Sequence, residues 1–216
     1  MPSWLIQHAV GDASAFHARD LPADQRVATF FDVLSPTLVL GSSQRVESVD
    51  TDSTTRHGVE IVRRRSGGGG VLLWPGEFVW LDLEIPAGDE LWSDDVGRSM
   101  WWVGELWRDA LAGFEPSATV HRGRLAHTEW SSDVCFAGVG PGEVLVGDAK
   151  LVGVSQRRTR HAARFQTMVH LRWRADVVAS LVGGGPTVDE LASVVRICAA
   201  SADDITARLI AAMQHL

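Results

Sequence analysis

Residues 144–173, VLVGDAKLVGVSQRRTRHAARFQTMVHLRW, carry the pattern that decides the fold. Two short apolar runs, Val144–Val146 and Leu151–Val154, flank Gly147-Asp148, where glycine supplies the positive φ of a tight hairpin turn. In the second half of the stretch, every other residue is apolar or threonine, and this period of two predicts a strand over 164–173. Strands joined by such short connections pair in antiparallel fashion, so an antiparallel sheet is expected here.

Outward from this stretch, the chain interleaves short strands with amphipathic helices. Apolar residues alternate within Phe78–Ile85, which predicts a half-buried strand, and Gly70–Trp74 is predicted to pair with it around Pro75-Gly76. Apolar residues at helical spacing predict a helix over 95–112. The remaining predictions are strands over 37–40 and 59–64 and helices that start at Thr187 and Ser201, each followed by an acidic residue three positions later.

These elements define the expected fold class. Strands and helices alternate, but several neighbouring strands are joined by hairpins, which does not fit a doubly wound parallel sheet. We therefore expect an α/β fold of the α+β kind, with a mixed, largely antiparallel sheet and flanking helices. A chain of 216 residues has the size of one domain, so a single domain over 1–216 is expected.

Composition narrows the class of protein. Apolar residues make up 45% and charged residues 22% of the chain, which is typical of a globular domain and excludes a disordered one. No apolar run reaches the roughly 18 to 20 residues of a membrane span, and no basic region followed by an apolar one marks a signal peptide. Cys135 and Cys198 are too few for a disulfide framework and indicate a reducing compartment. A cytoplasmic protein is expected.

Charge adds two observations. With 27 acidic and 20 basic residues the net charge is −7, which argues against nucleic acid as a general partner. The basic residues comprise 19 arginines and a single lysine, Lys150. A chain that uses arginine almost everywhere has a reason to keep lysine only where a compact ammonium is needed. The alternative is that one remaining lysine occurs there by chance.

A first candidate site is the run Arg63-Arg64-Arg65-Ser66-Gly67-Gly68-Gly69-Gly70. Consecutive glycines allow positive φ and close approach of the backbone to a ligand, and consecutive amides can bind an anion. No Gly-Lys-Ser/Thr follows, and position 72 is leucine, so the run is neither a P-loop nor a dinucleotide fingerprint. The alternative is a flexible connection between strands with solvated arginines.

A second candidate is Lys150, at the start of a predicted strand. It alternates there with Val152, Val154 and Gln156, so an ammonium on this face would be partly desolvated and able to stabilise developing negative charge. The alternative is an exposed lysine in a turn. A third candidate is Cys135, in a predicted loop ahead of this hairpin, where a nearby ammonium would favour its thiolate.

Cys135 is alternatively a small buried apolar side chain, as is expected of Cys198 in a predicted helix. No group of histidine, cysteine or carboxylate residues has metal-ligand spacing, so no protein-bound metal is expected.

Three segments together resemble the lipoate–protein ligase and octanoyltransferase family, part of the biotin/lipoate protein ligase superfamily. The glycine run resembles the RRxSGGG lipoate-binding loop of these enzymes. The run KLVGVSQRR, which begins at Lys150 and includes Gly153 and Gln156, is similar to the motif that holds the catalytic lysine. Gly41-Ser42-Ser43-Gln44 is similar to the short G-x-x-Q element after the first core strand.

The resemblance implies the catalytic-domain fold of this superfamily and transfer of a lipoyl or octanoyl group to a lysine of a lipoyl carrier domain. In a ligase, ATP and Mg²⁺ would activate the acyl group as an acyl-adenylate, and Arg64 and Gly67–Gly70 would hold the phosphate and the acyl end. The implied carriers are 2-oxoacid dehydrogenase E2 and glycine cleavage H protein. The arginines of the loop favour the ligase, because they suit a phosphate-bearing intermediate.

Two departures keep an alternative open. Leu73–Glu77 stands where ligases carry a His-Asp pair and a Gly-Asn, and the chain lacks the length of the C-terminal accessory domain that many ligases use. Cys135-Phe136 resembles the Cys-Phe element of cysteine-dependent octanoyltransferases, which take octanoate from acyl carrier protein and need no cofactor. A non-catalytic protein that binds lipoyl domains or an acyl ligand is a further alternative, and an accessory subunit is a possible partner.

Overall fold

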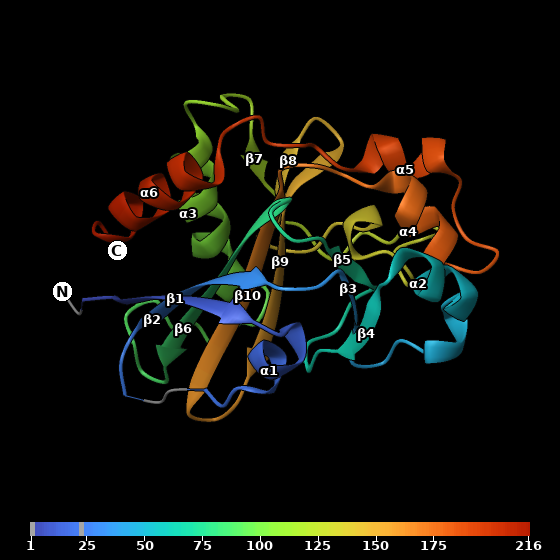
Figure 1. The fold of residues 1–216 in the computed structure, drawn as a ribbon. Coiled ribbons are helices and arrows are strands. Elements are labelled where there is room, and N and C mark those ends of the chain that lie inside the picture. Colours follow the sequence, from blue (N-terminus) through green and yellow to red (C-terminus); the bar gives the residue numbers. More distant parts are fainter. Residues whose placement is uncertain (1–2, 22–23) are drawn as a thin grey trace.

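The computed structural model of the chain describes residues 3–21 and 24–216, and within them ten strands form two sheets (Figure 1). The strands are β1 (Leu5–Gly11), β2 (Val27–Val33), β3 (Thr37–Leu40), β4 (Glu60–Arg63), β5 (Val71–Leu73), β6 (Phe78–Pro86), β7 (Thr119–Val120), β8 (Val144–Val146), β9 (Ala149–Arg158) and β10 (Ala162–His170). The helices are α1 (Ala13–Ala18), α2 (Thr51–His57), α3 (Trp101–Leu111), α4 (Ala175–Leu181), α5 (Val188–Val194) and α6 (Ala202–Met213), with short 3₁₀ turns η1 (Val46–Ser48), η2 (Arg98–Met100) and η3 (Cys135–Ala137).

The larger sheet has the order β1-β2-β6-β10-β9-β8-β7. Only β1 and β2 pair in parallel in it, and the other neighbours are antiparallel. The smaller sheet has the order β4-β3-β5, with β3 parallel to β4 and antiparallel to β5. The predicted mixed, largely antiparallel sheet with flanking helices is therefore confirmed, although it is divided into two sheets.

The main core lies between one face of the larger sheet and helices α3 and α6 (Figure 1). Val79, Leu81 and Leu83 of β6 point into it and meet Trp107 of α3 and Leu209 of α6. The prediction of a half-buried β6 is wrong in one respect, because the opposite face of this strand is buried as well. The smaller sheet and α1 cover that opposite face, and its apolar cluster includes Phe16, Leu73 and Trp80. A central strand between two layers has no solvated side.

The hairpin predicted from Gly70–Trp74 and Phe78–Ile85 is also wrong. Pro75-Gly76 does make a tight turn, with Gly76 at a φ of +76° and the Glu77 amide bonded to the carbonyl of Trp74. The flanking strands nevertheless pair elsewhere, β5 with β3 and β6 with β2 and β10. Since both edges of β6 are taken by other strands, β5 has no edge there to pair with, and the turn carries the chain from one sheet to the other.

Other local predictions are confirmed. Gly147 has a φ of +59° in the turn between β8 and β9. Thr187 forms a reciprocal capping box with Glu190 at the start of α5, and Ser201 accepts the Asp204 amide at the start of α6. Cys198 is buried as expected, but it lies in the irregular segment between these helices and not in one of them.

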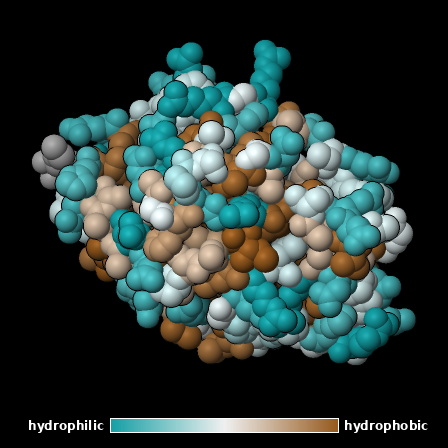
Figure 2. All heavy atoms as spheres, turned by 90° about the horizontal axis from the view of Figure 1, so that it is seen from above, coloured by the Kyte–Doolittle hydropathy of each residue, from teal (hydrophilic) through white to brown (hydrophobic). Residues whose placement is uncertain are grey.

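The surface mixes apolar and polar residues. On the face seen from above in Figure 2, hydrophobic patches lie across the middle, bordered by hydrophilic side chains. Within the described part of the chain, no helix combines the length and apolar character that a membrane crossing requires.

Candidate active site

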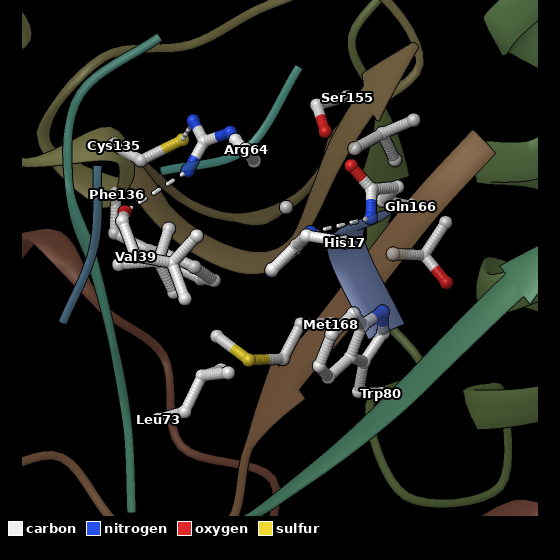
Figure 3. A pocket seen from close by; sticks show the side chains of 14 residues that line it. His17, Val39, Arg64, Leu73, Trp80, Cys135, Phe136, Ser155, Gln166 and Met168 are labelled. Atoms are coloured by element: carbon white, nitrogen blue, oxygen red, sulfur yellow. Dashed lines mark hydrogen bonds between the residues drawn. The ribbon is translucent and has the colours of Figure 1, made fainter. Parts of the chain in front are cut away.

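A cavity lies between the two sheets, on the face of the larger sheet that points away from α3 and α6 (Figure 3). It encloses about 460 Å³ of empty space, solvent at its mouth included. Most of its wall is apolar, contributed by both sheets and by η3: Val39, Val71, Leu73, Trp80, Phe136, Val154 and Met168. Polar side chains reach it at two places, Arg64 and Cys135 at one side and His17 and Gln166 at the other. A pocket of this kind suits a flexible apolar chain with one reactive end.

A second, wider cleft opens next to the cavity and encloses about 1,510 Å³, open solvent included. Its wall contains Gly67–Gly69 of the glycine run, Lys150 and Gln156. Cys135, Val154 and Ser155 line both spaces. Cys135 therefore lies where the apolar cavity meets the wider, open cleft.

Cys135 is positioned by the glycine run. Its amide donates to the carbonyl of Gly70 (2.9 Å), and the Gly70 amide donates to the carbonyl of Asp133 (2.8 Å). The guanidinium of Arg64 lies 3.8 Å from the Cys135 sulfur (Figure 3). Arg64 is only 5% exposed, and the same nitrogen donates to the carbonyls of Gly67 (2.7 Å) and Gly69 (2.9 Å). The arginine thus fixes the loop and presents a cation to the thiol.

Glycine is required at two positions of this arrangement. A Cβ on Gly41 would lie 1.8 Å from the carbonyl oxygen of Gly68, so the G-x-x-Q element and the glycine run fit only as bare backbone. Gly68 has a φ of +96°, which other residues rarely adopt. Among the described residues, the amides of Gly67, Gly68 and Gly69 find no backbone or side-chain acceptor. They lie in the wall of the cleft, where an anionic or carbonyl group could accept from them.

Two other residues of the run, Arg63 and Ser66, bond to protein groups. Arg63, expected to be free for an anion, donates to the carbonyls of Gly41 (2.8 Å) and Gln44 (2.5 Å). Ser66 is buried and bonds with the Ser155 hydroxyl (3.2 Å) and the Gln166 amide oxygen (3.1 Å). These bonds fasten the loop to both sheets.

Lys150 is buried, with 1% of its surface exposed. Its ammonium makes an ion pair with Glu143 (2.8 Å) and donates to the backbone carbonyl of Cys135 (2.7 Å). Glu143 is itself held by the amides of Gly140 (2.7 Å) and Val154 (3.2 Å). Removing two charges from water costs free energy, and the mutual attraction of the pair together with these hydrogen bonds offsets that cost. The only lysine of the chain therefore lies against the residue that carries the thiol.

The strand face predicted around Lys150 is partly wrong. Val154 and Gln156 line the cleft with the lysine, whereas Val152 packs into the main core, to which Val154 also belongs, and does not line the cleft. A register shift between β8 and β9, at Val144/Leu145, falls between Lys150 and Val152 and interrupts the alternation of side chains there.

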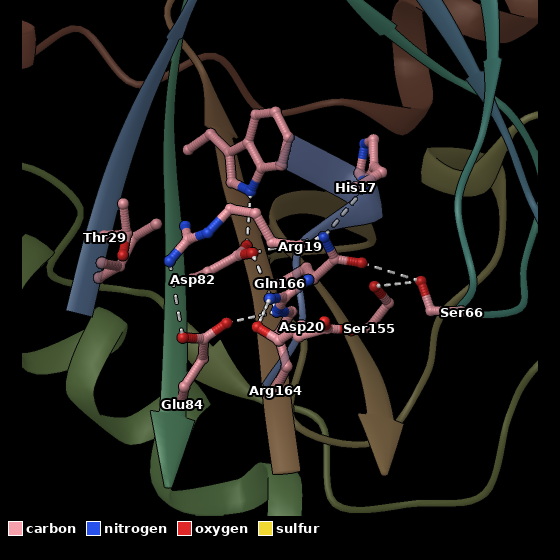
Figure 4. Close-up of polar contacts among 12 residues, drawn as sticks. His17, Arg19, Asp20, Thr29, Ser66, Asp82, Glu84, Ser155, Arg164 and Gln166 are labelled. Atoms are coloured by element: carbon pink, nitrogen blue, oxygen red, sulfur yellow. Dashed lines mark hydrogen bonds and ion pairs between the residues drawn. The ribbon is translucent and has the colours of Figure 1, made fainter. Parts of the chain in front are cut away.

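At the other side of the cavity, His17 of α1 stacks on Trp80 with ring centres 4.9 Å apart. Burial, with the charges of Arg64 and Arg164, lowers the pKa of His17 to about 3. The Gln166 amide nitrogen lies 3.2 Å from His17 Nδ1 and 3.5 Å from a carboxylate oxygen of Asp82 (Figure 4). Burial raises the pKa of Asp82 to about 7, against the opposing effect of Arg164.

The model of the lipoyl protein ligase A/B catalytic domain matches residues 12–190. The chain belongs to this family. The resemblance drawn from the three segments is thereby confirmed, and so is the catalytic-domain fold.

Solved structures of family members share this fold at low sequence identity. A lipoate-protein ligase A bound with ATP is 17% identical, with a TM-score of 0.74 over 99% of this chain and 84% of that one. A bi-partite lipoate protein ligase from Thermoplasma acidophilum, studied with its E2 lipoyl domain, is 15% identical, with a TM-score of 0.72 over 97% and 82%. LipL1 of P. falciparum in complex with lipoate is 10% identical, with a TM-score of 0.68 over 99% and 60%. The search among curated proteins gives no match.

Within this lipoyl ligase domain, the predicted site residues come together. Gln44 accepts the Gly41 amide (3.3 Å) and donates to the carbonyl of Asp133 (3.1 Å), so it joins two loops of the site. Gln156 bonds with Ser99 (3.0 Å) in the cleft. Gly153 borders the cavity, and a Cβ there would lie 3.1 Å from the Phe136 ring.

The sequence did not point to Glu143, His17 or Gln166. Glu143 precedes β8 by one residue and carries no motif of its own, and Gln166 is an ordinary polar residue in an alternating strand. His17 is one of eight scattered histidines. The described residues contain no group of three or more His, Cys, Asp or Glu arranged to hold a metal.

Proposed function

We propose that the protein is an acyltransferase of the lipoyl ligase family that moves a medium-chain acyl group through a thioester on Cys135 to a lysine of a lipoyl carrier domain. The observation that carries the proposal is the place of Cys135, at the junction of an apolar cavity and an open cleft. An acyl chain in the cavity would have its carbonyl carbon at the sulfur, and a donor or acceptor carrier would approach through the cleft.

The reaction has two steps. The thiolate of Cys135 attacks an acyl thioester, for which octanoyl acyl carrier protein is the expected donor; the new C–S bond forms, and the carrier thiolate leaves and takes up a proton. A neutral lysine amine of the lipoyl carrier domain then attacks the Cys135 thioester. The amide forms, the amine loses a proton, and the Cys135 thiolate is regenerated.

The surrounding cations support both steps. Arg64, 3.8 Å from the sulfur, would stabilise the thiolate as nucleophile and as leaving group. The ammonium of Lys150 donates to the backbone carbonyl of Cys135. A short movement would bring it to the acyl oxygen, where negative charge develops during the reaction. The free amides of Gly67–Gly69 offer further donors on the cleft side.

A ligase that forms an acyl-adenylate is the second candidate. It is favoured by those same amides, which suit a phosphate, and by likeness in fold to a ligase bound with ATP. ATP, with Mg²⁺ carried on its phosphates, would supply the activation of a free acid, and Gly67–Gly69 would hold the phosphate. The arginines that first favoured this candidate argue less for it here, because Arg63 and Arg64 bond to backbone carbonyls.

The proposed partners follow from the carrier chemistry. The proposed acceptor is a lipoyl domain of a 2-oxoacid dehydrogenase E2 or glycine cleavage H protein, in the cytoplasm, and residues 1–216 are proposed to form a single catalytic domain. A non-catalytic binding protein remains the third reading. The buried Lys150–Glu143 pair beside a thiol argues against it, because binding an apolar chain needs neither group.

Mass spectrometry after incubation with octanoyl acyl carrier protein tests the proposal. We expect an adduct of one octanoyl group on Cys135 and its transfer to a lipoyl domain without ATP. In Cys135→Ser both should be lost, because a hydroxyl is a far weaker nucleophile than a thiolate. Cys198→Ser is the control and should keep both. Pyrophosphate release that depends on ATP and lipoate, with full activity in Cys135→Ser, would establish the ligase instead.

A further inference from the structure

His17 is a buried polar side chain in the wall of an otherwise apolar part of the cavity. It is 8% exposed, and its neighbours in the wall include Trp80, Met168 and Leu73. Figure 3 shows its ring and the Cys135 sulfur on different sides of the cavity. A chain attached at Cys135 that fills the cavity would therefore reach His17 with its distal part.

The hydrogen bonds around His17 fix where its proton lies. The Gln166 amide oxygen accepts from the Ser66 hydroxyl (3.1 Å), so the Gln166 nitrogen is the atom that faces His17 Nδ1, at 3.2 Å. That nitrogen donates, and Nδ1 is then the acceptor. The lowered pKa, about 3, keeps the ring neutral, so its single proton is on Nε2.

This Nε2–H donor is unused. Within the described residues, Nε2 is buried from solvent and has no hydrogen-bond partner. The stack on Trp80, at 26° between ring planes, restricts rotation of the ring away from this position. Buried donors are nearly always paired, and an unpaired one costs stability unless a ligand supplies the acceptor.

We propose that His17 is a specificity-determining residue that favours acyl groups carrying a hydrogen-bond acceptor in their distal part. The dithiolane sulfurs of a lipoyl group and the oxygen of a hydroxyacyl group share this chemistry, and an unsubstituted chain lacks it. Plain octanoyl would bind less tightly but would still fit the apolar wall and serve as a donor in the proposed reaction. The inference rests on one part of the proposed function, namely that the cavity binds the acyl chain.

Binding of free acids tests this inference separately from catalysis. Affinities of lipoate, octanoate and octanoates hydroxylated at carbon 6 or 8 are measured by calorimetry in Cys135→Ser, which prevents thiol–disulfide exchange with lipoate. His17→Phe is added to remove the donor while keeping a flat ring. His8→Phe, the same change at an exposed position of β1, is the control.

We expect His17→Phe to lower the affinity for lipoate or a hydroxyoctanoate, relative to octanoate, by about 2- to 10-fold, the worth of one hydrogen bond. His8→Phe should leave this ratio unchanged. The same ratio in both variants would overturn the inference.

If His17→Phe does not fold, binding to the protein that keeps His17 still tests the inference. A hydroxyl buried without a partner weakens binding strongly. If both hydroxyoctanoates bind more than about 10-fold more weakly than octanoate to the protein with His17, no donor meets them and the inference is wrong. Absence of acyl transfer through Cys135, with the affinity ratio as expected, would refute the proposed function and leave the role of His17 standing.

Discussion

At the scale of single residues, the proposed reaction divides between two cations the tasks that one cation could have performed. Arg64 faces the sulfur of Cys135, while Lys150 faces the carbonyl of the same residue. The sequence had suggested that the lysine would serve both the thiolate and the acyl oxygen. The guanidinium is fixed by loop carbonyls, whereas the ammonium is a compact charge on a flexible chain, held by Glu143. In the proposed reaction, the ammonium would exchange the Cys135 carbonyl for the acyl oxygen, whereas the guanidinium would stay on the loop.

Replacing Lys150 with arginine should therefore abolish acyl transfer. The guanidinium is planar and larger, and it cannot occupy the buried point between Glu143 and the Cys135 carbonyl. We expect a loss of about 10²- to 10³-fold in kcat, as for removal of one oxyanion donor. A circular-dichroism melting curve checks that the variant folds. Retention of more than about a tenth of the activity would refute the role assigned to the lysine.

A substitution of Glu143 tests the same role of Lys150 with a smaller expected loss of activity. Glu143→Gln keeps the size of the side chain but removes the charge that holds Lys150, and its single amide oxygen can accept from only one of the Gly140 and Val154 amides. We expect a drop in kcat smaller than that of Lys150→Arg, with KM for the acyl donor nearly unchanged, because the cavity is intact. A rise in KM alone would show that Glu143 shapes binding and does not position the ammonium.

At the scale of elements, the glycine run is a link between sheets. It follows β4, precedes β5 and is bonded to the segment before η3 and, through Ser66, to β9 and β10. Gly68 has a positive φ, and Gly67, Gly68 and Gly69 line the cleft. A change in this loop should consequently disturb Cys135 more than it disturbs folding.

Gly68→Val should show this difference. A Cβ at Gly68 would lie 3.0 Å from the Arg64 guanidinium and 3.5 Å from the Cys135 sulfur, and valine disfavours a φ of +96°. Gly88→Val is a matched control, because Gly88 has a φ of +84° in a turn where an added Cβ meets nothing within 4 Å. Both variants should lose about 1 to 3 kcal/mol of stability, but only Gly68→Val should lose acylation of Cys135. Equal acylation in the two variants would mean that the run is only a connection.

Elements set by neighbouring residues were predictable from the sequence. Gly147 in the β8–β9 turn and the caps Thr187 and Ser201 act within a few residues, and the structure has them as expected. The β5–β6 hairpin failed because pairing there depends on which strand edges are free, and β2 and β10 occupy those of β6. A turn signal fixes the direction of the chain but not the partners of the strands on either side of it.

At the scale of the whole molecule, the site is made by the contact of two sheets, and sequence could not show it. Arg64 and Cys135 are 71 residues apart, Ser66 and Gln166 are 100 apart, and Gln166 and His17 are 149 apart. The motifs marked one wall of the site, because a glycine run and a lone lysine are visible without partners. The opposite wall includes His17 and Gln166, which belong to no motif, and their role can be inferred only from the side chains that they contact in the folded protein.

Burial between layers also leaves titratable groups out of water, and His170 gives a test of this at the scale of global stability. Burial alone lowers its pKa from 6.5 to about 3, with its ring 4.6 Å from that of Phe136 and 4.9 Å from that of Trp173. The folded protein therefore resists protonation, whereas the unfolded chain takes up a proton near pH 6.5. The stability that the neutral ring contributes is present above pH 6.5 and is lost as the pH falls towards 3.

His170→Phe should remove this sensitivity. The free energy of unfolding of both proteins is measured by urea denaturation at pH 7 and pH 5. We expect the original protein to lose about 2 kcal/mol more than the variant over this interval, since 1.5 pH units below the unfolded pKa correspond to that amount. His17 and Asp82, whose pKa values are also displaced, are present in both proteins and cancel in the comparison. Equal losses in the two proteins would mean that His170 is already accessible to protons in the folded state, and the layer that covers it would then be loosely packed.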